Sequence, residues 1–373
     1  MRILALDIGT GTQDILLFDS SRATENSVQL VMPAPTVIAA RRVRVATQGR
    51  RPVVFTGTNM GGGPVTGAVE QHLAAGLSAY ATPDAAVTFD DDPEAVRVMG
   101  ISLVSEDEAA RIEGAIVELK DLDLEMVRRA LSAFEVTPEW DALAVAVFDH
   151  GNAPPGYSDR KFRFDYLREQ LTGGRREVFD SVHMADELPE YLTRMRAVAD
   201  TAGGAAPLLM TDTPRAAIMG SLEDPRVTAE HCKVVACIGN EHTLAFHLHG
   251  TTILGLFEHH THVLTRERLE EHIVELVRGD LDGDRLWREQ GHGAVVLQGG
   301  EELSFLSIIG PMRGLLEGSR LNPYFATPHG SMMLAGCFGL VRAWAERHPS
   351  ARDEIVSALR TVGEDIGHQG HRT

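Results

Sequence analysis

The sequence has few cysteines, few lysines and no long apolar run. Three cysteines in 373 residues are an odd number and too few for a disulfide framework. No apolar stretch approaches the roughly 20 residues of a membrane-spanning helix. The first apolar run, Ile3–Leu6, stops at Asp7, well short of the apolar segment of a signal peptide. We therefore expect a cytoplasmic protein with no membrane partner.

Lysine occurs only at Lys120, Lys161 and Lys233. None of them follows the glycines of a G-x-x-x-x-G-K-[ST] loop or stands in a V-A-I-K strand, which excludes P-loop NTPases and protein kinases. Acidic residues outnumber basic ones by 53 to 35, and the formal net charge of −18 opposes binding to nucleic acid. One basic cluster alternates with valines, as on the exposed face of an edge strand, and comprises Arg41, Arg42, Arg44, Arg50 and Arg51.

Length and patterning predict an α/β protein of two closely apposed domains. Apolar residues make up 43% of the chain and charged residues 24%, which is typical of globular proteins. Buried-strand patterns alternate with helical ones, which favours layered sheets and helices. Strands are expected at Ile3–Ile8, Leu143–Phe148 and Lys233–Ile238, and helices at Pro64–Ala79 and Ser331–Arg347.

A glycine-rich turn follows the first strand, in the segment Asp7-Ile8-Gly9-Thr10-Gly11-Thr12. A dinucleotide-binding loop is excluded because Asp14 stands where the third glycine is needed and the chain continues as a strand, not a helix. A hairpin of this composition can instead bind an anion through its backbone N–H groups, with Thr10 and Thr12 as hydroxyl donors. Asp7 is positioned to hold a hydrated Mg²⁺ beside that anion. Gly61-Gly62-Gly63, before a proline-initiated helix, is a second candidate anion site.

The turn resembles the first phosphate loop of the acetate and sugar kinases, heat-shock chaperone ATPases and actins. This resemblance implies two ribonuclease-H-like domains that flank a central nucleotide cleft. An internal repeat agrees with it, since Ile238-Gly239 aligns with Ile8-Gly9 at an offset of 230 residues. By this resemblance the second phosphate loop comprises Gly239, Asn240, His242 and Thr243, and Gly299-Gly300 resembles the adenosine loop. Cys237 stands where the superfamily usually has a second carboxylate.

A closer resemblance extends over nearly the whole chain and includes the segments D-T-P-R-A-A-I-M-G, G-N-E-H-T-L-A-F and P-H-G-S-M-M-L-A-G-C-F-G-L. These segments are similar to a prokaryotic family labelled "putative pyruvate formate-lyase activating enzyme". The label implies radical S-adenosylmethionine chemistry, which needs three cysteines in C-x3-C-x2-C. Cys232, Cys237 and Cys337 do not have this spacing, so we reject that activity.

Histidine is abundant, with 16 residues, and several histidines follow expected strands. A transition-metal site for Zn²⁺, Fe²⁺ or Mn²⁺ could draw on His150, His259, His260 and His329. The alternatives are histidines that make polar loop contacts or donate to phosphate. We expect the strand at Thr251–Phe257 to run on, so that only one of His259 and His260 faces the cleft. Candidate general bases are the carboxylates that follow apolar strands, Asp149 and Glu258.

We therefore predict domains at residues 1–225 and 226–373, with ATP and Mg²⁺ bound between them. The expected activity is phosphoryl transfer or slow ATP hydrolysis coupled to lobe closure. Two alternatives stay open: a metal-dependent enzyme that uses the histidines, and a nucleotide-sensing module without turnover. The expected partners are the nucleotide and a small-molecule or protein client, with a homodimer as an option.

Overall fold

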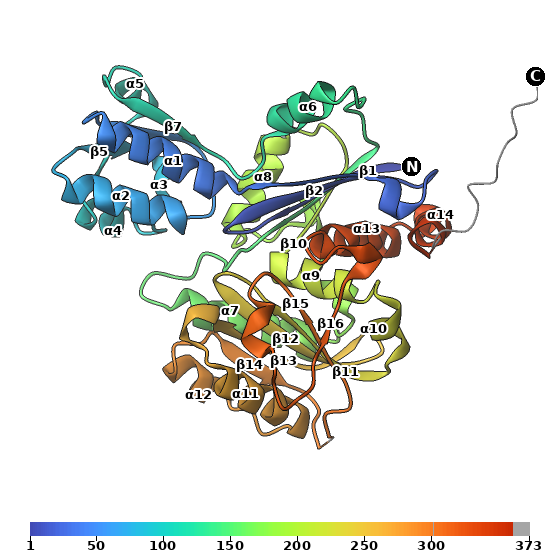
Figure 1. Ribbon diagram of the computed structural model, residues 1–373. Coiled ribbons are helices and arrows are strands. Elements are labelled where there is room, and N and C mark those ends of the chain that lie inside the picture. Colours follow the sequence, from blue (N-terminus) through green and yellow to red (C-terminus); the bar gives the residue numbers. More distant parts are fainter. Residues whose placement is uncertain (301, 361–373) are drawn as a thin grey trace, which may run out of the picture.

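The computed structural model describes residues 1–300 and 302–360, in which two six-stranded sheets and one four-stranded sheet are found (Figure 1). The first sheet has the order β3-β2-β1-β8-β10-β9. Its strands are β1 (Arg2–Ile8), β2 (Thr12–Asp19), β3 (Val28–Pro33), β8 (Ala142–Val147), β9 (His183–Met184) and β10 (Leu208–Thr211). β1, β2 and β3 form an antiparallel meander, and β8 and β10 run parallel to β1.

The second sheet has the order β14-β13-β12-β11-β15-β16, in which the run β13-β12-β11-β15-β16 repeats β3-β2-β1-β8-β10 and β14 is added at the edge. Its strands are β11 (Cys232–Ile238), β12 (His242–His249), β13 (Thr252–His260), β14 (Gly293–Val296), β15 (Leu306–Ile309) and β16 (Tyr324–Phe325). β11 and β12 begin and end 230 residues after β1 and β2. β15 pairs in parallel with β11, as β8 does with β1. The predicted fold of two ribonuclease-H-like domains is confirmed, and the strands predicted to be equivalent lie in separate sheets.

Each first strand is buried on both faces, which explains its continuous apolar sequence. In β1, Ile3 and Ala5 face a core that also contains Val235 of β11, whereas Leu4 faces a separate core on the outer side of the first sheet. The shared core lies between the two sheets, which form the first and second lobes of the molecule. Apolar side chains of the repeated strands therefore hold the two lobes together and also build the core of each lobe.

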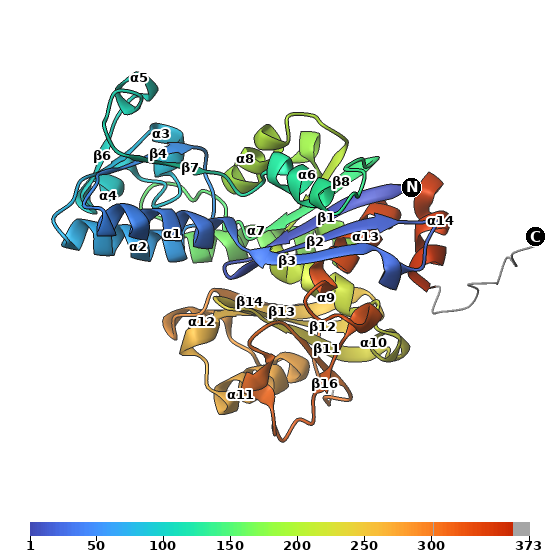
Figure 2. The ribbon, with the colours of Figure 1, turned by 45° about the horizontal axis from the view of Figure 1, so that its top comes forward.

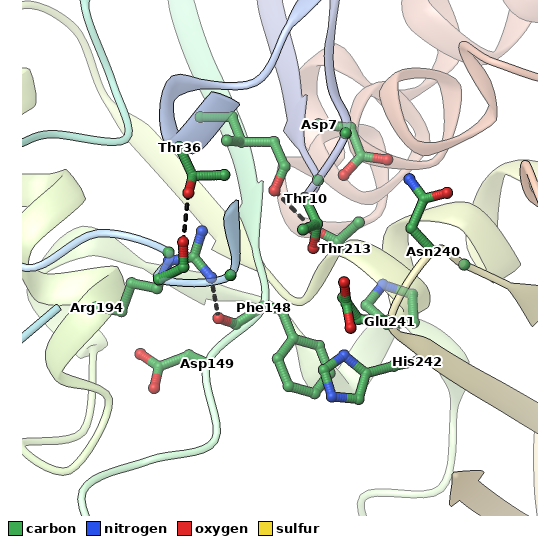
Figure 3. Close-up of a pocket in the computed structure, with 18 of the residues that line it drawn as sticks. Asp7, Thr10, Thr36, Phe148, Asp149, Arg194, Thr213, Asn240, Glu241 and His242 are labelled. Atoms are coloured by element: carbon green, nitrogen blue, oxygen red, sulfur yellow. Dashed lines mark hydrogen bonds between the residues drawn. The ribbon is translucent and has the colours of Figure 1, made fainter. Parts of the chain in front are cut away.

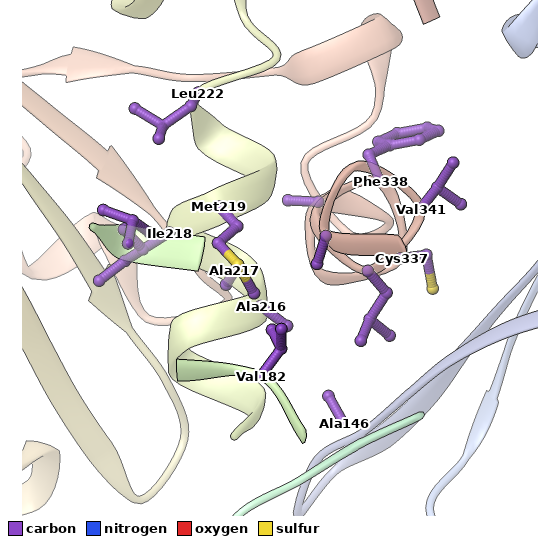
Figure 4. Packing of buried hydrophobic residues seen from close by; sticks show 14 of the residues in the cluster. Ala146, Val182, Ala216, Ala217, Ile218, Met219, Leu222, Cys337, Phe338 and Val341 are labelled. Atoms are coloured by element: carbon purple, nitrogen blue, oxygen red, sulfur yellow. The ribbon is translucent and has the colours of Figure 1, made fainter. Parts of the chain in front are cut away.

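Two helices fill the space between the sheets, α9 (Thr213–Ser221) and α13 (Ala335–Arg347). α9 packs on β11, β12 and β15, and α13 packs on β1, β2 and β8, so each helix belongs to one lobe and contacts the other helix (Figure 4). Glycine makes this approach possible, because a Cβ on Gly220 would lie 1.7 Å from the carbonyl oxygen of Ala335.

The chain returns to the first lobe near its end. α13 and α14 (Pro349–Arg360) pack with the first sheet, and the amino group of Met1 pairs with Glu354 at 2.7 Å. The predicted boundary at residue 225 separates the two sheets, but the predicted second domain, 226–373, is not self-contained. Its last residues, 361–373, lie outside the described part of the chain.

A subdomain is inserted between β3 and β8 and projects to one side of the first sheet (Figure 2). Its sheet has the order β6-β5-β4-β7, with β4 (Val53–Gly57), β5 (Ala79–Ala81), β6 (Ile101–Leu103) and β7 (Ala115–Leu119). Its helices are α1 (Pro35–Gln48), α2 (Pro64–Ala74), α3 (Pro83–Ala86), α4 (Pro93–Val98) and α5 (Glu106–Ala109).

The arginine cluster predicted on an edge strand belongs to this subdomain, and that prediction is wrong. Arg41, Arg42 and Arg44 lie on α1, and Arg50 and Arg51 follow it. Pro35 begins the helix at its first turn, and the buried residues recur at helical spacing: Thr36, Ala39, Ala40, Val43 and Ala46. The helical spacing is set mainly by small alanines. The alternation of arginine with valine in the same segment is typical of a strand and led to the wrong prediction.

The remaining helices pack around the two sheets, some on the outer faces and some against the shared core. They are α6 (Leu124–Ala133), α7 (Asp159–Thr172), α8 (Thr193–Ala202), α10 (Pro225–Ala229), α11 (Arg266–Arg278) and α12 (Gly283–Arg288). α7 follows β8 in the chain but packs on β14 of the second sheet. Among the described residues, none of the helices has the length and apolarity to cross a membrane.

Candidate functional site

A cavity of about 570 Å³ lies between the lobes, within the size range of small-molecule sites. It is lined by the turns of both hairpins, by the ends of β8 and β15, and by the first residues of α13. The glycine loop of the inserted subdomain closes another side. Figure 3 shows side chains from both lobes pointing toward this space.

The two hairpin turns have the same local structure. The N–H of Gly9 donates to the carbonyl of Thr12 at 2.9 Å, and the N–H of Gly239 donates to that of His242 at the same distance. The predicted phosphate-loop residues that line the cavity are Gly9, Thr10, Gly11, Thr12, Gly239, Asn240 and His242. Thr243 does not line it, because its buried hydroxyl faces that of Thr261 at 3.0 Å.

Gly299 and Gly300, predicted as the adenosine loop, do not line the cavity. They pack against the end of α11, where the N–H of Gly300 donates to the carbonyl of Arg278 at 2.8 Å. The reason is strand direction: β14 runs antiparallel to β13, so its end points away from the cleft, whereas β15 runs parallel to β11. The residues after β15, Gly310-Pro311, line the cavity instead.

Asp7 and Asp14 form a buried carboxylate pair beneath the first hairpin. They are direct cross-strand partners of β1 and β2, and both line the cavity. One oxygen of each, Oδ1, is buried and has no hydrogen-bond partner among the described residues. Burial and the charge of Asp14 raise the pKa of Asp7 well above its usual range, and burial raises the pKa of Asp14 to about 7. Two such oxygens suit a divalent cation, which prefers carboxylate ligands.

The predicted site did not include Asp14, although its position in the sequence indicates that it pairs with Asp7. Asp7 and Asp14 lie at equal distances from the centre of the turn, and residues so placed pair across a hairpin. In the second hairpin, burial and the charge of Asp7 raise the pKa of Cys237 to about 12, so this cavity-lining thiol is neutral. A carboxylate is nevertheless present in that turn, because Glu241 also lines the cavity (Figure 3).

Asp149 lines the cavity, but its carboxylate is already engaged. One oxygen accepts from the N–H of Gly151 and the other from the N–H of Met195, each at 2.9 Å. Burial raises the pKa of Asp149 to about 6. Its carboxylate therefore anchors the loop after β8 to the start of α8. This geometry fits an organising residue better than the predicted general base.

Glu258 does not reach the cavity, so the predicted role of general base does not fit it. Its side chain is fully buried and forms an ion pair with Arg163, with Nη2 and Oε2 2.9 Å apart. Arg163 also pairs with Asp212 at 3.0 Å. Residues 159–163 form the first turn of α7, and Arg163 is a buried link between the lobes.

The glycine loop of the inserted subdomain lies opposite the first hairpin. A Cβ on Gly63, whose φ is +42°, would lie 3.1 Å from Cγ2 of Thr10. The hydroxyl of Thr36 donates to the carbonyl of Gly62. Arg194 brings a guanidinium to this end of the cavity and is paired with Asp121 at 2.7 Å. The predicted anion site at Gly61–Gly63 stays a prediction.

The structure brings together a different set of histidines from the one predicted. Ring nitrogens of His150, His242 and His292 lie within 4.8 Å of one another. His329 is remote from them, beside Phe338 and 3.9 Å from Glu25. Sequence reasoning missed His292, because only the pairing of β13 with β14 places it beside the cleft.

β13 continues through His260, which confirms that the strand runs on past Phe257. His260 lines the cavity, whereas the buried His259 stacks near His272, with ring centroids 5.9 Å apart. Burial lowers the pKa of both His242 and His260 to about 4, so both imidazoles are neutral near pH 7.

Comparison with known proteins gives one family match. Residues 60–315 match the model of the family described as "Putative pyruvate format-lyase activating enzyme (DUF1786)". No curated protein matches the chain. Among solved structures, the chain is similar to the ethanolamine utilization protein EutJ from Carboxydothermus hydrogenoformans, with 12% identity, a TM-score of 0.31, and coverage of 91% of this chain and 89% of the other.

Proposed function

This chain belongs to the family described as "Putative pyruvate format-lyase activating enzyme", and we propose that it binds ATP and Mg²⁺ in the cavity between its lobes. The activity that we propose is phosphoryl transfer or slow ATP hydrolysis coupled to lobe closure. One observation carries the proposal: two hairpins of the same structure face one cavity, with the unpartnered oxygens of Asp7 and Asp14 beneath the first of them.

In this proposal Asp7 and Asp14 hold the cation, and the two turns bind the phosphates. Thr10 and Thr12 add hydroxyl donors from the first turn, and Asn240 adds a side-chain amide from the second. When bound, Mg²⁺ neutralises phosphate charge. Gly310-Pro311, not Gly299-Gly300, borders the part of the cavity that we assign to the adenosine.

Lobe closure is supported by the contacts at the bottom of the cleft. Phe148 of the first lobe stacks on His242 of the second, with ring centroids 4.1 Å apart. A ligand that touches both hairpins would bind the closed arrangement better than an open one, and only such differential binding can drive closure.

The radical chemistry implied by the family description does not fit the cysteines. Cys232 and Cys237 lie at opposite ends of β11, roughly 17 Å apart at the usual rise of a strand. Cys337 is buried in α13, with its Sγ 3.1 Å from the carbonyl oxygen of Asp14. Three thiolates so placed cannot bind one iron–sulfur cluster.

A nucleotide-sensing module without turnover is the second candidate. The observation that favours it is the state of the two predicted bases: Asp149 is held by two backbone N–H groups, and Glu258 is outside the cavity. An assay of phosphate release from ATP separates the two candidates, because only the ATPase releases phosphate faster than a protein-free control.

Calorimetric titration with ATP, in Mg²⁺ and in EDTA, tests the proposal. Asp7→Asn should weaken binding in Mg²⁺ by about 10- to 150-fold, which corresponds to the roughly 1.5–3 kcal/mol of a charge-assisted contact. Binding in EDTA should change little. Asp159→Asn is the matched control, since Asp159 lines the same cavity away from the hairpins. Equal affinities of wild type and Asp7→Asn in Mg²⁺ would refute the assignment.

A further inference from the structure

Three histidines from three separate segments meet at the bottom of the cleft. His150 follows β8 of the first lobe, His242 begins β12, and His292 immediately precedes β14. Nε2 of His150 and Nε2 of His292 are 3.1 Å apart, and a ring nitrogen of His242 completes a group within 4.8 Å. This set goes beyond the nucleotide function proposed above and does not depend on it.

We propose that His150, His242 and His292 form a binding site for a divalent transition metal of the zinc type. Nitrogens that ligate one tetrahedral metal at 2.0–2.1 Å are about 3.3 Å apart, close to the separation of His150 and His292. A nitrogen donor set favours Zn²⁺ and its neighbours, whereas Mg²⁺ prefers oxygen and is assigned to the aspartates.

Neighbouring residues restrict the positions of His242 and His292. Phe148 stacks on His242 with an interplanar angle of 5°. The backbone N–H of His292 donates to the backbone carbonyl of Glu258 at 3.0 Å, and Oε1 of the same glutamate lies 3.5 Å from Nε2 of His292.

A metal bound by these three histidines would have a fourth coordination position, and the surroundings of that position determine which ligands it could bind. His150 and His242 line the cavity, whereas His292 lies behind them and is buried. Three protein ligands with a fourth position open to a cavity are the arrangement of catalytic zinc sites. The fourth ligand would be an oxygen of a cavity-bound molecule, such as a phosphate, carboxylate or hydroxyl group. His260, whose ring centroid is 4.6 Å from that of His292, is the neighbouring polar side chain on the cavity side.

The test uses the full-length chain without a histidine tag, stripped with EDTA and titrated with Zn²⁺ against a chromophoric chelator. Wild type should bind one equivalent of Zn²⁺, and Co²⁺ should give the visible bands of a four-coordinate site. Both signals should be lost in His292→Gln and in His150→Gln. His262→Gln is the control and should keep both signals, because His262 lines the cavity but is exposed and lies outside the group.

Far-UV circular dichroism separates a lost site from a lost fold. His150 lines the cavity and is less buried than His292, so we expect His150→Gln to stay folded. Its Zn²⁺ binding can then be measured even if His292→Gln unfolds. Equal Zn²⁺ binding by wild type and a folded His150→Gln would overturn the proposal, as would loss of binding in His262→Gln. A parallel titration with ATP–Mg²⁺ tests the nucleotide proposal separately, because loss of Zn²⁺ binding does not imply loss of ATP–Mg²⁺ binding, and the reverse also holds.

Discussion

Gly11 of the first hairpin lies against Asn240 of the second: a Cβ on Gly11 would come within 2.7 Å of the Nδ2 atom of Asn240. The φ of Gly11 is not in the left-handed region, so the backbone itself would accept another residue. Glycine at this position therefore leaves room for the side-chain amide of Asn240 from the other lobe.

Gly11→Ala should keep the fold and weaken ATP–Mg²⁺ binding. The end of the Asn240 side chain can rotate away from the new Cβ, which displaces the amide that we assign to phosphate binding; loss of one such hydrogen bond costs roughly 0.5–1.5 kcal/mol, or about 2- to 13-fold in affinity. The control is Gly67→Ala in α2, where a Cβ would meet nothing within 4 Å and a gain of roughly 0.5–1 kcal/mol in stability is expected. Calorimetry and thermal unfolding of both variants measure these changes; full affinity in Gly11→Ala would contradict the expectation.

Asp14→Asn should change how stability depends on pH. The pKa of Asp14 is raised to about 7 by burial, so the folded state binds a proton that the unfolded state releases near pH 4. The carboxyl therefore makes the folded state progressively less stable as pH rises from about 4 to about 7, by at most about 4 kcal/mol. The variant lacks this titration.

Urea unfolding of wild type and Asp14→Asn between pH 5 and pH 8 measures the difference. The variant should gain stability relative to wild type as pH rises, and saturating Mg²⁺ should reduce the difference by stabilising the ionised pair of Asp7 and Asp14. Parallel pH profiles of the two proteins would show that the carboxyl titrates normally.

Arg163→Met should destabilise the protein strongly. Arg163 is fully buried and pairs with both Asp212 and Glu258, so its removal leaves the buried Glu258 without its guanidinium and Asp212 with only the more distant Arg215, at 3.7 Å. The expected loss is about 3–5 kcal/mol in the free energy of unfolding. In Arg129→Met, which breaks an exposed pair with Glu125, the change should stay within about 0.5 kcal/mol. Chemical denaturation of both variants measures these changes. Similar small losses in the free energy of unfolding would mean that the ion pairs of Arg163 add little to stability.

Gly220→Ala should force α9 and α13 apart. The new Cβ would meet the backbone carbonyl of Ala335 at 1.7 Å, and a backbone atom cannot rotate away as the end of a side chain can. We expect a loss of roughly 1–3 kcal/mol in stability, seen as a lower Tm. An unchanged Tm would show that the two helices can separate freely.

Several features followed from the sequence alone because they are local. The hairpin at Asp7–Thr12 and its repeat at residues 237–243 are set by turn residues between apolar runs, and these signals do not depend on distant parts of the chain. The prediction that the strand continues past Phe257 is also confirmed, since β13 runs through His260. The topology of two repeated sheets confirms the fold that the resemblance implied.

Other features were decided only by the tertiary structure, because each depends on the direction or pairing of strands far apart in the sequence. The end of β15 reaches the cleft and the end of β14 does not, so Gly310 replaces Gly299 at the cavity. Hairpin register makes Asp14 the partner of Asp7. His292 meets His150 across 142 residues of chain. A local sequence pattern does not show contacts between residues that are far apart in the chain. These side chains come together because the strands that hold them bury their apolar faces against α9 and α13.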